Sequence, residues 1–159
     1  MSRFSGALFL AFFILIFPSL IFAYSYLGKP DGFTNDFAGV LNSDQRVIIE
    51  NKLEKFEQDT GSQIAIAIIK SLGDDTIENY SVSLFKEWGI GEKGKDNGIL
   101  LLIALDDHKV RIEVGYGLEE RLTDIQSREI INSILKPNFR AGNFFRGIDL
   151  AVDQIITEI

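Results

Sequence analysis

The sequence predicts an α/β fold: a compact three-layer domain in which a small mixed β-sheet is flanked by about four helices. Two short runs, Gln63 to Ile69 and Ile99 to Leu105, are apolar on both faces, which is typical of strands that helices cover on each side. Helical patterns with start and stop signals separate and follow these runs. This alternation of strands and helices indicates the layered architecture.

A third strand is predicted from Val110 to Val114, where apolar residues alternate with Arg111 and Glu113. We expect the apolar side chains to face the core and the two charged ones to face water. The turn before this strand is so short that the strand must form an antiparallel hairpin with the preceding one. The loops Gly91 to Gly98 and Gly115 to Asp124 therefore leave the sheet at the same end and share one rim.

The helices are predicted from capping signals and apolar periodicity. If the chain crosses between the two buried runs in the usual right-handed sense, those strands are parallel. Helix starts are marked by Asn42 or Ser43 with Gln45, by Asp75 with Glu78, and by Thr123 with Gln126. We expect Pro137 to close the third of these helices. The last helix presents one apolar face made of Ile148, Val152, Ile155 and Ile159.

Composition excludes several classes of function. The formal net charge of −7 disfavours nucleic acid as a partner, because an acidic domain repels phosphate backbones. The absence of cysteine excludes disulfides, thiolate metal ligands and a cysteine nucleophile. Gly89, Gly91 and Gly94 match a GxGxxG pattern, but this pattern follows a helix and precedes a strand, the reverse of the dinucleotide-binding order. We therefore expect no nucleotide cofactor.

The N-terminus predicts export. Arg3 is followed by the uncharged apolar run Ala7 to Ala23, and Ala23 with Ser25 forms a small-residue cleavage pair. Residues 1–25 are therefore a signal peptide or an uncleaved N-terminal anchor, because the run approaches the ~20 residues that span a bilayer. Residues 26–33 form a linker and residues 34–159 the domain. The expected location is the periplasm or cell envelope.

Oxygen-bearing side chains gather at the predicted rim. Carboxylates and an amide suit calcium or magnesium rather than zinc or copper. The candidate metal ligands are Asp36, Asp96, Asn97, Glu119 and Asp124. Asp36 joins this set only if the segment after it crosses the sheet. Lys93, Lys95 and Arg140 are candidates for binding an anionic or phosphate group. The alternative is that these acidic residues only cap turns and helices.

Four passages resemble the TPM-domain family. They are an ND-aromatic-AGVL segment from Asn35 to Leu41, a TGSQIAI strand entry from Thr60 to Ile66, the long glycine-rich passage from Trp88 to Glu119, and a PxFRAGxFxxGI segment from Pro137 to Ile148. The resemblance spans roughly residues 33–156. Its known members include a thylakoid-lumen acid phosphatase linked to photosystem II repair, a receptor modulator and bacterial envelope proteins, and metal-bound TPM domains are known.

The resemblance implies two alternative functions. The first is a binding, assembly or maintenance module for a membrane protein complex or another envelope protein, docking through aromatics such as Tyr116, Phe144 and Phe145. The second is a metal-dependent acid phosphatase. The sequence holds no known phosphatase motif and no serine nucleophile paired with a histidine base, which favours the binding module. His108, the only histidine, is expected to be a solvated turn residue rather than a ligand or base.

Overall fold

The computed structural model describes residues 27–159, so the predicted signal peptide or anchor lies outside the described residues. A four-stranded sheet is combined with helices and short helical turns. The elements in chain order are β1 (Thr34–Asp36), α1 (Ser43–Thr60), β2 (Gln63–Ile69), α2 (Ile77–Trp88), β3 (Gly98–Ala104), β4 (Lys109–Val114), the 3-10 turn η1 (Tyr116–Leu118), α3 (Asp124–Ile130), the π-helical turn η2 (Ile131–Leu135), α4 (Lys136–Arg140) and α5 (Phe144–Glu158).

The sheet has the order β1-β2-β3-β4. Its first three strands are parallel, with Gln63 opposite Gly98, and β4 returns antiparallel to β3, with Ala104 opposite Lys109. The parallel crossover and the hairpin are therefore confirmed. The strand β1 was not predicted, because three residues at a sheet edge carry no periodicity that a sequence pattern can reveal.

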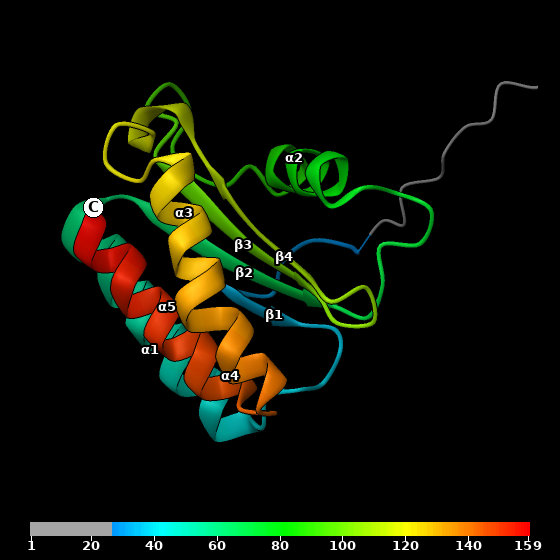
Figure 1. The fold of residues 1–159 in the computed structure, drawn as a ribbon. Helices are drawn as coiled ribbons and strands as arrows, with labels where there is room; N and C mark the ends of the chain where they lie inside the picture. Colours follow the sequence, from blue (N-terminus) through cyan, green and yellow to red (C-terminus); the bar gives the residue numbers. More distant parts are fainter. Residues whose placement is uncertain (1–26) are drawn as a thin grey trace, which may run out of the picture.

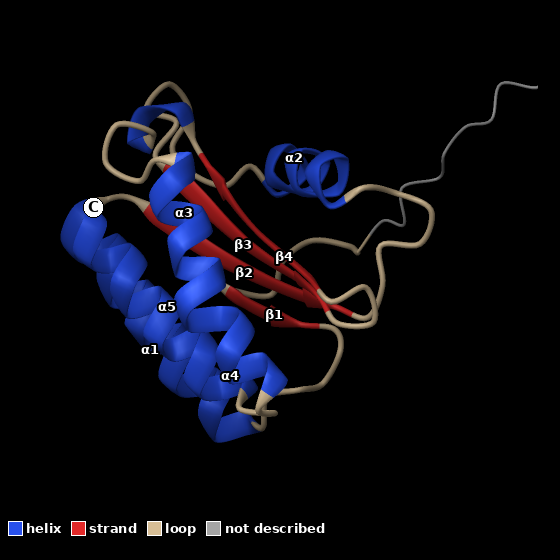
Figure 2. Cartoon of the chain, in the orientation of Figure 1, coloured by secondary structure: helices blue, strands red, loops and turns tan. Residues whose placement is uncertain are grey.

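The helices form a layer on each side of the sheet, which confirms the three-layer architecture (Figures 1 and 2). Among the helices of residues 27–159, α2 covers one face, and α1, α3, α4 and α5 cover the other (Figure 1). Alternate residues of β2 divide between two apolar cores: Ile64, Ile66 and Ile68 face the larger helical layer, and Ala65 and Ala67 face α2. Each buried strand is thus apolar on both faces because each face has its own core.

Two of the predicted capping boxes are present. Asn42 accepts a hydrogen bond from the backbone N–H of Gln45 at the start of α1, and Thr123 does the same for Gln126 at the start of α3. Helix α2 is different, because its cap is Thr76 rather than Asp75. The sequence thus predicts the position of each start to within one residue.

The expectation that Pro137 closes its helix is wrong. The helix continues through the π-helical turn η2 into α4, where Pro137 lies in the first turn. The backbone N–H of Lys136 donates to the carbonyl of Ile131, five residues back. This widened turn shifts the hydrogen-bond pattern just before the proline, which has no N–H to donate, so the ring is accommodated.

Arg111 and Glu113 do not face water as expected. Both are half-buried on the α2 side of the sheet, where Arg111 Nε lies 2.7 Å from Glu113 Oε2. The same carboxylate oxygen accepts a hydrogen bond of 3.0 Å from the hydroxyl of Ser81, a fully buried residue of α2. The charged face of β4 therefore contacts α2 and is only partly exposed to solvent.

Residues 27–33, which the sequence predicts as a linker, lie against the domain. The indole N–H of Trp88 donates to the carbonyl of Gly28 at 3.0 Å. The carboxylate of Glu50 accepts from the backbone N–H groups of Phe33 and Thr34 at 2.8 and 2.6 Å, which ties β1 to α1. Within residues 27–159, no helix is long and apolar enough to cross a bilayer.

Candidate functional site

The two ends of the sheet carry different chemistry. We call the end where β2 and β3 begin the amino-end rim, and the end where they finish the carboxyl-end rim. The loops before β3 and after β4 lie at the amino-end rim, as predicted. The hairpin turn between β3 and β4 and the segment after β1 lie at the carboxyl-end rim, because β1 runs parallel to β2.

Three glycines clamp the two loops of the amino-end rim together. A Cβ atom on Gly98, Gly115 or Gly117 would lie 2.4, 2.2 or 2.1 Å from a backbone oxygen. The N–H of Gly115 donates to Gly98, and that of Gly117 donates to the carbonyl of Asp96 at 3.1 Å. A side chain at Gly115 or Gly117 would push the two loops apart, and one at Gly98 would collide with Ile90 at the other end of the same loop, so the glycines are required by backbone contact.

Asn97 is a structural brace in this rim. It is buried, its side-chain oxygen accepts from the N–H of Glu92 at 2.7 Å, and its amide donates to the carbonyl of Gly61 at 2.8 Å. These bonds join the glycine loop to the end of α1. The amide oxygen already has a backbone partner, so Asn97 does not fit the role of an open metal ligand.

Asp36 is not part of the amino-end rim, which corrects the expectation that its segment crosses the sheet. It pairs with Ile68, next to the last residue of β2, at the carboxyl-end rim. Its Oδ1 accepts from the N–H groups of Ala38 and Gly39 at 3.2 and 2.8 Å, and its Oδ2 accepts from Leu41 at 2.8 Å. Its carboxylate organises the turn into α1.

The remaining candidate ligands, Asp96, Glu119 and Asp124, are exposed at the amino-end rim. The side chain of Asp124 is 91% exposed and lies 3.9 Å from Arg128. Among residues 27–159, no group of three or more histidine, aspartate or glutamate side chains is placed to hold a metal ion. The five predicted residues therefore do not form one donor set, and no chemical step is derived through a metal.

The three candidate anion-binding residues are also divided. Lys93 and Lys95 are exposed on the glycine loop, and Lys95 forms an ion pair of 2.5 Å with Glu92. Arg140 lies at the end of α4, on the carboxyl-end rim. The structure thus assigns Arg140 to a separate site.

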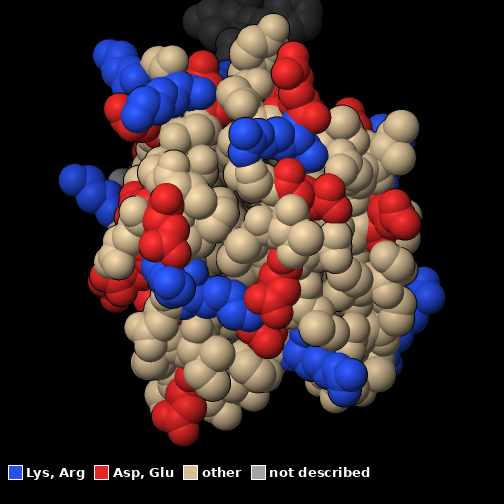
Figure 3. Space-filling model, turned by 90° about the vertical axis from the view of Figure 1, so that its left-hand side faces the viewer, with Lys and Arg blue, Asp and Glu red and all other residues tan. Residues whose placement is uncertain are grey.

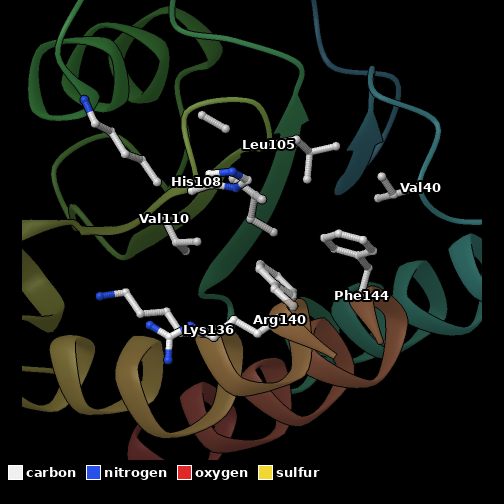
Figure 4. Close-up of a pocket in the computed structure, with 11 residues that line it drawn as sticks. Val40, Leu105, His108, Val110, Lys136, Arg140 and Phe144 are labelled. Atoms are coloured by element: carbon white, nitrogen blue, oxygen red, sulfur yellow. The ribbon is translucent and has the colours of Figure 1, made fainter. Parts of the chain in front are cut away.

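That separate site is a cavity of about 610 Å³ at the carboxyl-end rim. The end of β3, the hairpin turn and the start of β4 form one side, and α4 with the start of α5 forms the other (Figure 4). Its walls are largely apolar, with Val40, Leu105 and Val110 opposite the aromatic rings of Phe139 and Phe144. The sequence did not predict this cavity, because its two sides are far apart in the chain.

The segment that links α4 to α5 builds the aromatic wall. The rings of Phe139 and Phe144 lie 5.1 Å apart between centroids, at a tilted angle of 40°. Gly147 permits this packing, because a Cβ there would lie 2.9 Å from Asn138 Cβ and 3.0 Å from the ring of Phe139. The FRAGxFxxG passage thus places two aromatic rings side by side in one wall of the cavity.

Four of the side chains that line the cavity are basic, and we call the part of the cavity where they lie its mouth. His108 and Lys109 come from the hairpin, and Lys136 and Arg140 come from α4, one turn apart. Figure 4 shows Lys136, Arg140 and Phe144 on the helical side of the cavity, with Leu105, His108 and Val110 on the hairpin side. The lining residues include no aspartate or glutamate. The signal that a sequence analysis could have used is the position of His108 and Lys109 in the hairpin that follows a buried parallel strand.

On the face drawn in Figure 3, basic and acidic side chains are interspersed rather than separated by sign. The charged residues that line the cavity are all basic, whereas the chain as a whole is net acidic.

Comparison with protein-family models identifies the domain. The TPM domain matches residues 34–158. The chain belongs to the TPM-domain family. Two of the passages that resemble this family build the glycine clamp and the aromatic wall, which lie at opposite ends of this TPM domain.

Solved structures share the fold of this TPM domain. The N-terminal domain of a protein from P. gingivalis is 32% identical, with a TM-score of 0.74, over 79% of this chain and 80% of that one. The BA42 protein of Bizionia argentinensis is 16% identical, with a TM-score of 0.65, over 77% and 83% of the two chains. The N-terminal domain of cg2496 from Corynebacterium glutamicum is 12% identical, with a TM-score of 0.62, over 84% and 86%. The search of curated proteins found no match.

Proposed function

We propose that this TPM domain is exported to the periplasm or cell envelope and acts there as a binding module that assembles or maintains a membrane protein complex. The observation that carries this proposal is the exposure of Tyr116, which reaches 81%. Tyrosine combines a large apolar surface with a polar tip, and it is enriched at the energetic centres of protein interfaces.

The backbone that carries Tyr116 is held by close contacts, which supports a binding role. The residue lies in the 3-10 turn η1, between the clamp glycines Gly115 and Gly117, and the turn is anchored by Leu118, which is buried. The N–H of Leu118 donates to the carbonyl of Gly115 at 2.9 Å. A backbone already fixed before binding loses little entropy on binding, so an aromatic side chain held this way is a suitable anchor.

A second large apolar side chain is exposed at the same end. Ile125, in the first turn of α3, is 76% exposed. Exposed apolar residues close to acidic ones are suited to a partner that offers both apolar and basic groups. The proposed partner is therefore a membrane protein complex or another envelope protein with such a surface.

A divalent cation, calcium or magnesium, remains part of the proposal, with fewer side-chain ligands than the sequence predicts. Because no three acidic side chains converge within residues 27–159, the side-chain ligands in this proposal are at most two of Asp96, Glu119 and Asp124, which are exposed at the rim. Backbone carbonyls of the glycine loop and water would complete an oxygen-rich shell, as calcium accepts. In this proposal the ion orders the loops that flank Tyr116.

The alternative function is a metal-dependent acid phosphatase at the same rim. Exposed Lys93 and Lys95 next to exposed carboxylates favour it, because cations stabilise a transferred phosphoryl group. The test is hydrolysis of a generic phosphoester with calcium, magnesium or manganese, from acid to neutral pH. Robust turnover that disappears in Asp96→Ala would establish the phosphatase, whereas the binding module predicts no metal-dependent turnover.

Co-purification from native membranes tests the binding module. Tyr116→Ser should reduce the recovery of one defined membrane partner at least fivefold, because a central aromatic anchor commonly contributes about 2 kcal/mol or more. Tyr116→Phe keeps the ring and should retain most of the recovery. The matched control is Leu150→Ser, on α5, whose residue is 41% exposed in the native protein. Equal recovery with all three variants would contradict the proposal.

A further inference from the structure

The cavity at the carboxyl-end rim combines two properties that point to one kind of ligand. Its walls are apolar and aromatic, and its mouth carries only basic side chains. A volume of about 610 Å³ lies within the range of small-molecule sites, which is about 300–1,000 Å³. The cavity also lies where β3 ends, and ligands of open α/β sheets bind at the carboxyl ends of parallel strands.

The basic side chains at the mouth have no acidic partner within residues 27–159. No ion pair is found there for His108, Lys109, Lys136 or Arg140, and Lys136 Nζ donates only to the neutral Asn132 Oδ1, at 2.8 Å. The nearest acidic residue in sequence to His108 is Asp107, whose carboxylate accepts from the N–H of Leu72 at 2.8 Å. The positive charge of the mouth is therefore available to a ligand.

We propose that this cavity binds a free single-chain anionic amphiphile of the fatty carboxylate class. The apolar chain lies between the Phe139–Phe144 wall and the hairpin, and the anionic head lies at Arg140 and Lys136. Arg140 suits this role because its planar guanidinium can donate two parallel hydrogen bonds to a carboxylate. The inference concerns the end of the domain opposite Tyr116 and does not depend on the proposed docking surface.

Simpler ligands fit the cavity less well. A small inorganic anion would pair with the basic side chains but leave the apolar walls in contact with water. A neutral hydrocarbon would cover the walls but leave the basic side chains without a counter-charge. A cationic amphiphile would be repelled at the mouth. Only a ligand with both an apolar chain and an anionic head satisfies both parts of the site.

Titration of the exported protein, purified in its native form, with four probes tests the proposal. The probes are decanoate below its micelle concentration, decanol, acetate and decyltrimethylammonium, followed by amide chemical shifts. Decanoate should shift the amides of Leu105, Val110 and Phe144. Acetate should produce no saturable shift, and decanol and the cationic probe should bind at least several-fold more weakly than decanoate.

A pair of arginine variants locates the head group. Arg140→Gln, an exposed position, should weaken decanoate binding roughly fivefold or more, because a charge-assisted bidentate contact is lost. The same variant should leave decanol binding unchanged. Arg146→Gln is the matched control, since Arg146 is exposed on α5 but is not among the lining residues, and it should leave both affinities unchanged.

Three results would overturn the proposal. The first is equal binding of decanoate, decanol and decyltrimethylammonium, which would indicate unspecific apolar contact. The second is equal weakening of decanoate binding by both arginine variants, which would indicate a diffuse charge effect. The third is sedimentation with phosphatidylglycerol vesicles, lost in Arg140→Gln, without binding of free decanoate. That result would assign the basic mouth to a membrane surface instead.

Discussion

Replacing Asp36 by alanine separates two roles for this carboxylate, a turn cap and a metal ligand. Its oxygens accept hydrogen bonds from the backbone N–H groups of Ala38, Gly39 and Leu41, at 3.2, 2.8 and 2.8 Å. Those bonds hold the turn between β1 and α1. Alanine removes all three acceptors at once, so we expect the turn to loosen and the domain to lose stability whether or not a divalent cation is present.

The size of the loss follows from the number and exposure of these bonds. A hydrogen bond to a charged group contributes about 1.5–3 kcal/mol, but Gly39 is exposed, so water replaces part of this when the acceptor is removed. About 1 kcal/mol for each bond gives about 3 kcal/mol in total. For a domain of this size, that loss lowers the midpoint of thermal unfolding by roughly 10 °C.

The assay is thermal unfolding of the native protein, Asp36→Ala and Glu119→Ala, each measured with chelator and with millimolar calcium or magnesium. Asp36→Ala should show the full loss of stability, about 3 kcal/mol, with chelator and with either cation. Glu119→Ala is the matched control, because this exposed carboxylate makes no hydrogen bond or ion pair within residues 27–159, and it should change stability by less than about 0.5 kcal/mol in chelator. If Asp36→Ala were as mild as Glu119→Ala in chelator, or lost stability only with metal, the turn-cap reasoning would be refuted.

Three further predictions concern the cation, α1 and the N-terminus. If Asp96 helps to hold calcium or magnesium, cation at one hundred times its dissociation constant should stabilise the native protein by about 2.7 kcal/mol, and the same cation concentration should stabilise Asp96→Asn by less. An unfolding curve that the cation does not move would contradict a metal at this rim. Burial lowers the pKa of Lys52, but its hydrogen bonds and charge interactions with Asp149 and Asp153 outweigh burial and leave the pKa raised above 10.5. Lys52→Met should therefore lower the free energy of unfolding by about 1 kcal/mol at neutral pH, measured by urea unfolding, and the difference from the native protein should shrink as the pH rises above 10.5. A difference that stays constant with pH would exclude the ion pairs as its cause. The intact mass of the native protein should correspond to a chain that begins near Tyr24 or Tyr26, whereas a full-length chain in the membrane would indicate an anchor.

The sequence was sufficient for the layers of the fold, because the signals were local. Continuous apolar runs marked the buried strands, and the capping residues Asn42 and Thr123 marked helix starts. The short strand β1 had no such signal. Its bonds to Glu50 connect residues 16 and 17 positions apart, and no periodicity encodes a contact of that kind.

The candidate site was only partly accessible to sequence analysis. The hairpin brought the two glycine loops together as predicted, since a short turn leaves no other arrangement. The prediction of where Asp36 lies was wrong. The segment after Asp36 is long enough for this residue to lie at either end of the sheet, and the parallel pairing of β1 with β2 places it at the carboxyl-end rim. The cavity was missed because it requires the chain to continue as a helix through Pro137 and bring Arg140 to the hairpin.

Site-specific photo-crosslinking in the native envelope tests the central claim most directly, namely that the amino-end rim is a docking surface. A photoreactive amino acid at position 116 should give one discrete crosslinked product whose partner, identified by mass spectrometry, is an integral membrane protein. The same group at position 150, on α5, should give no such product. A position-116 probe that yields no product, or the same products as position 150, would contradict the docking surface and with it the account of this domain as a binding module.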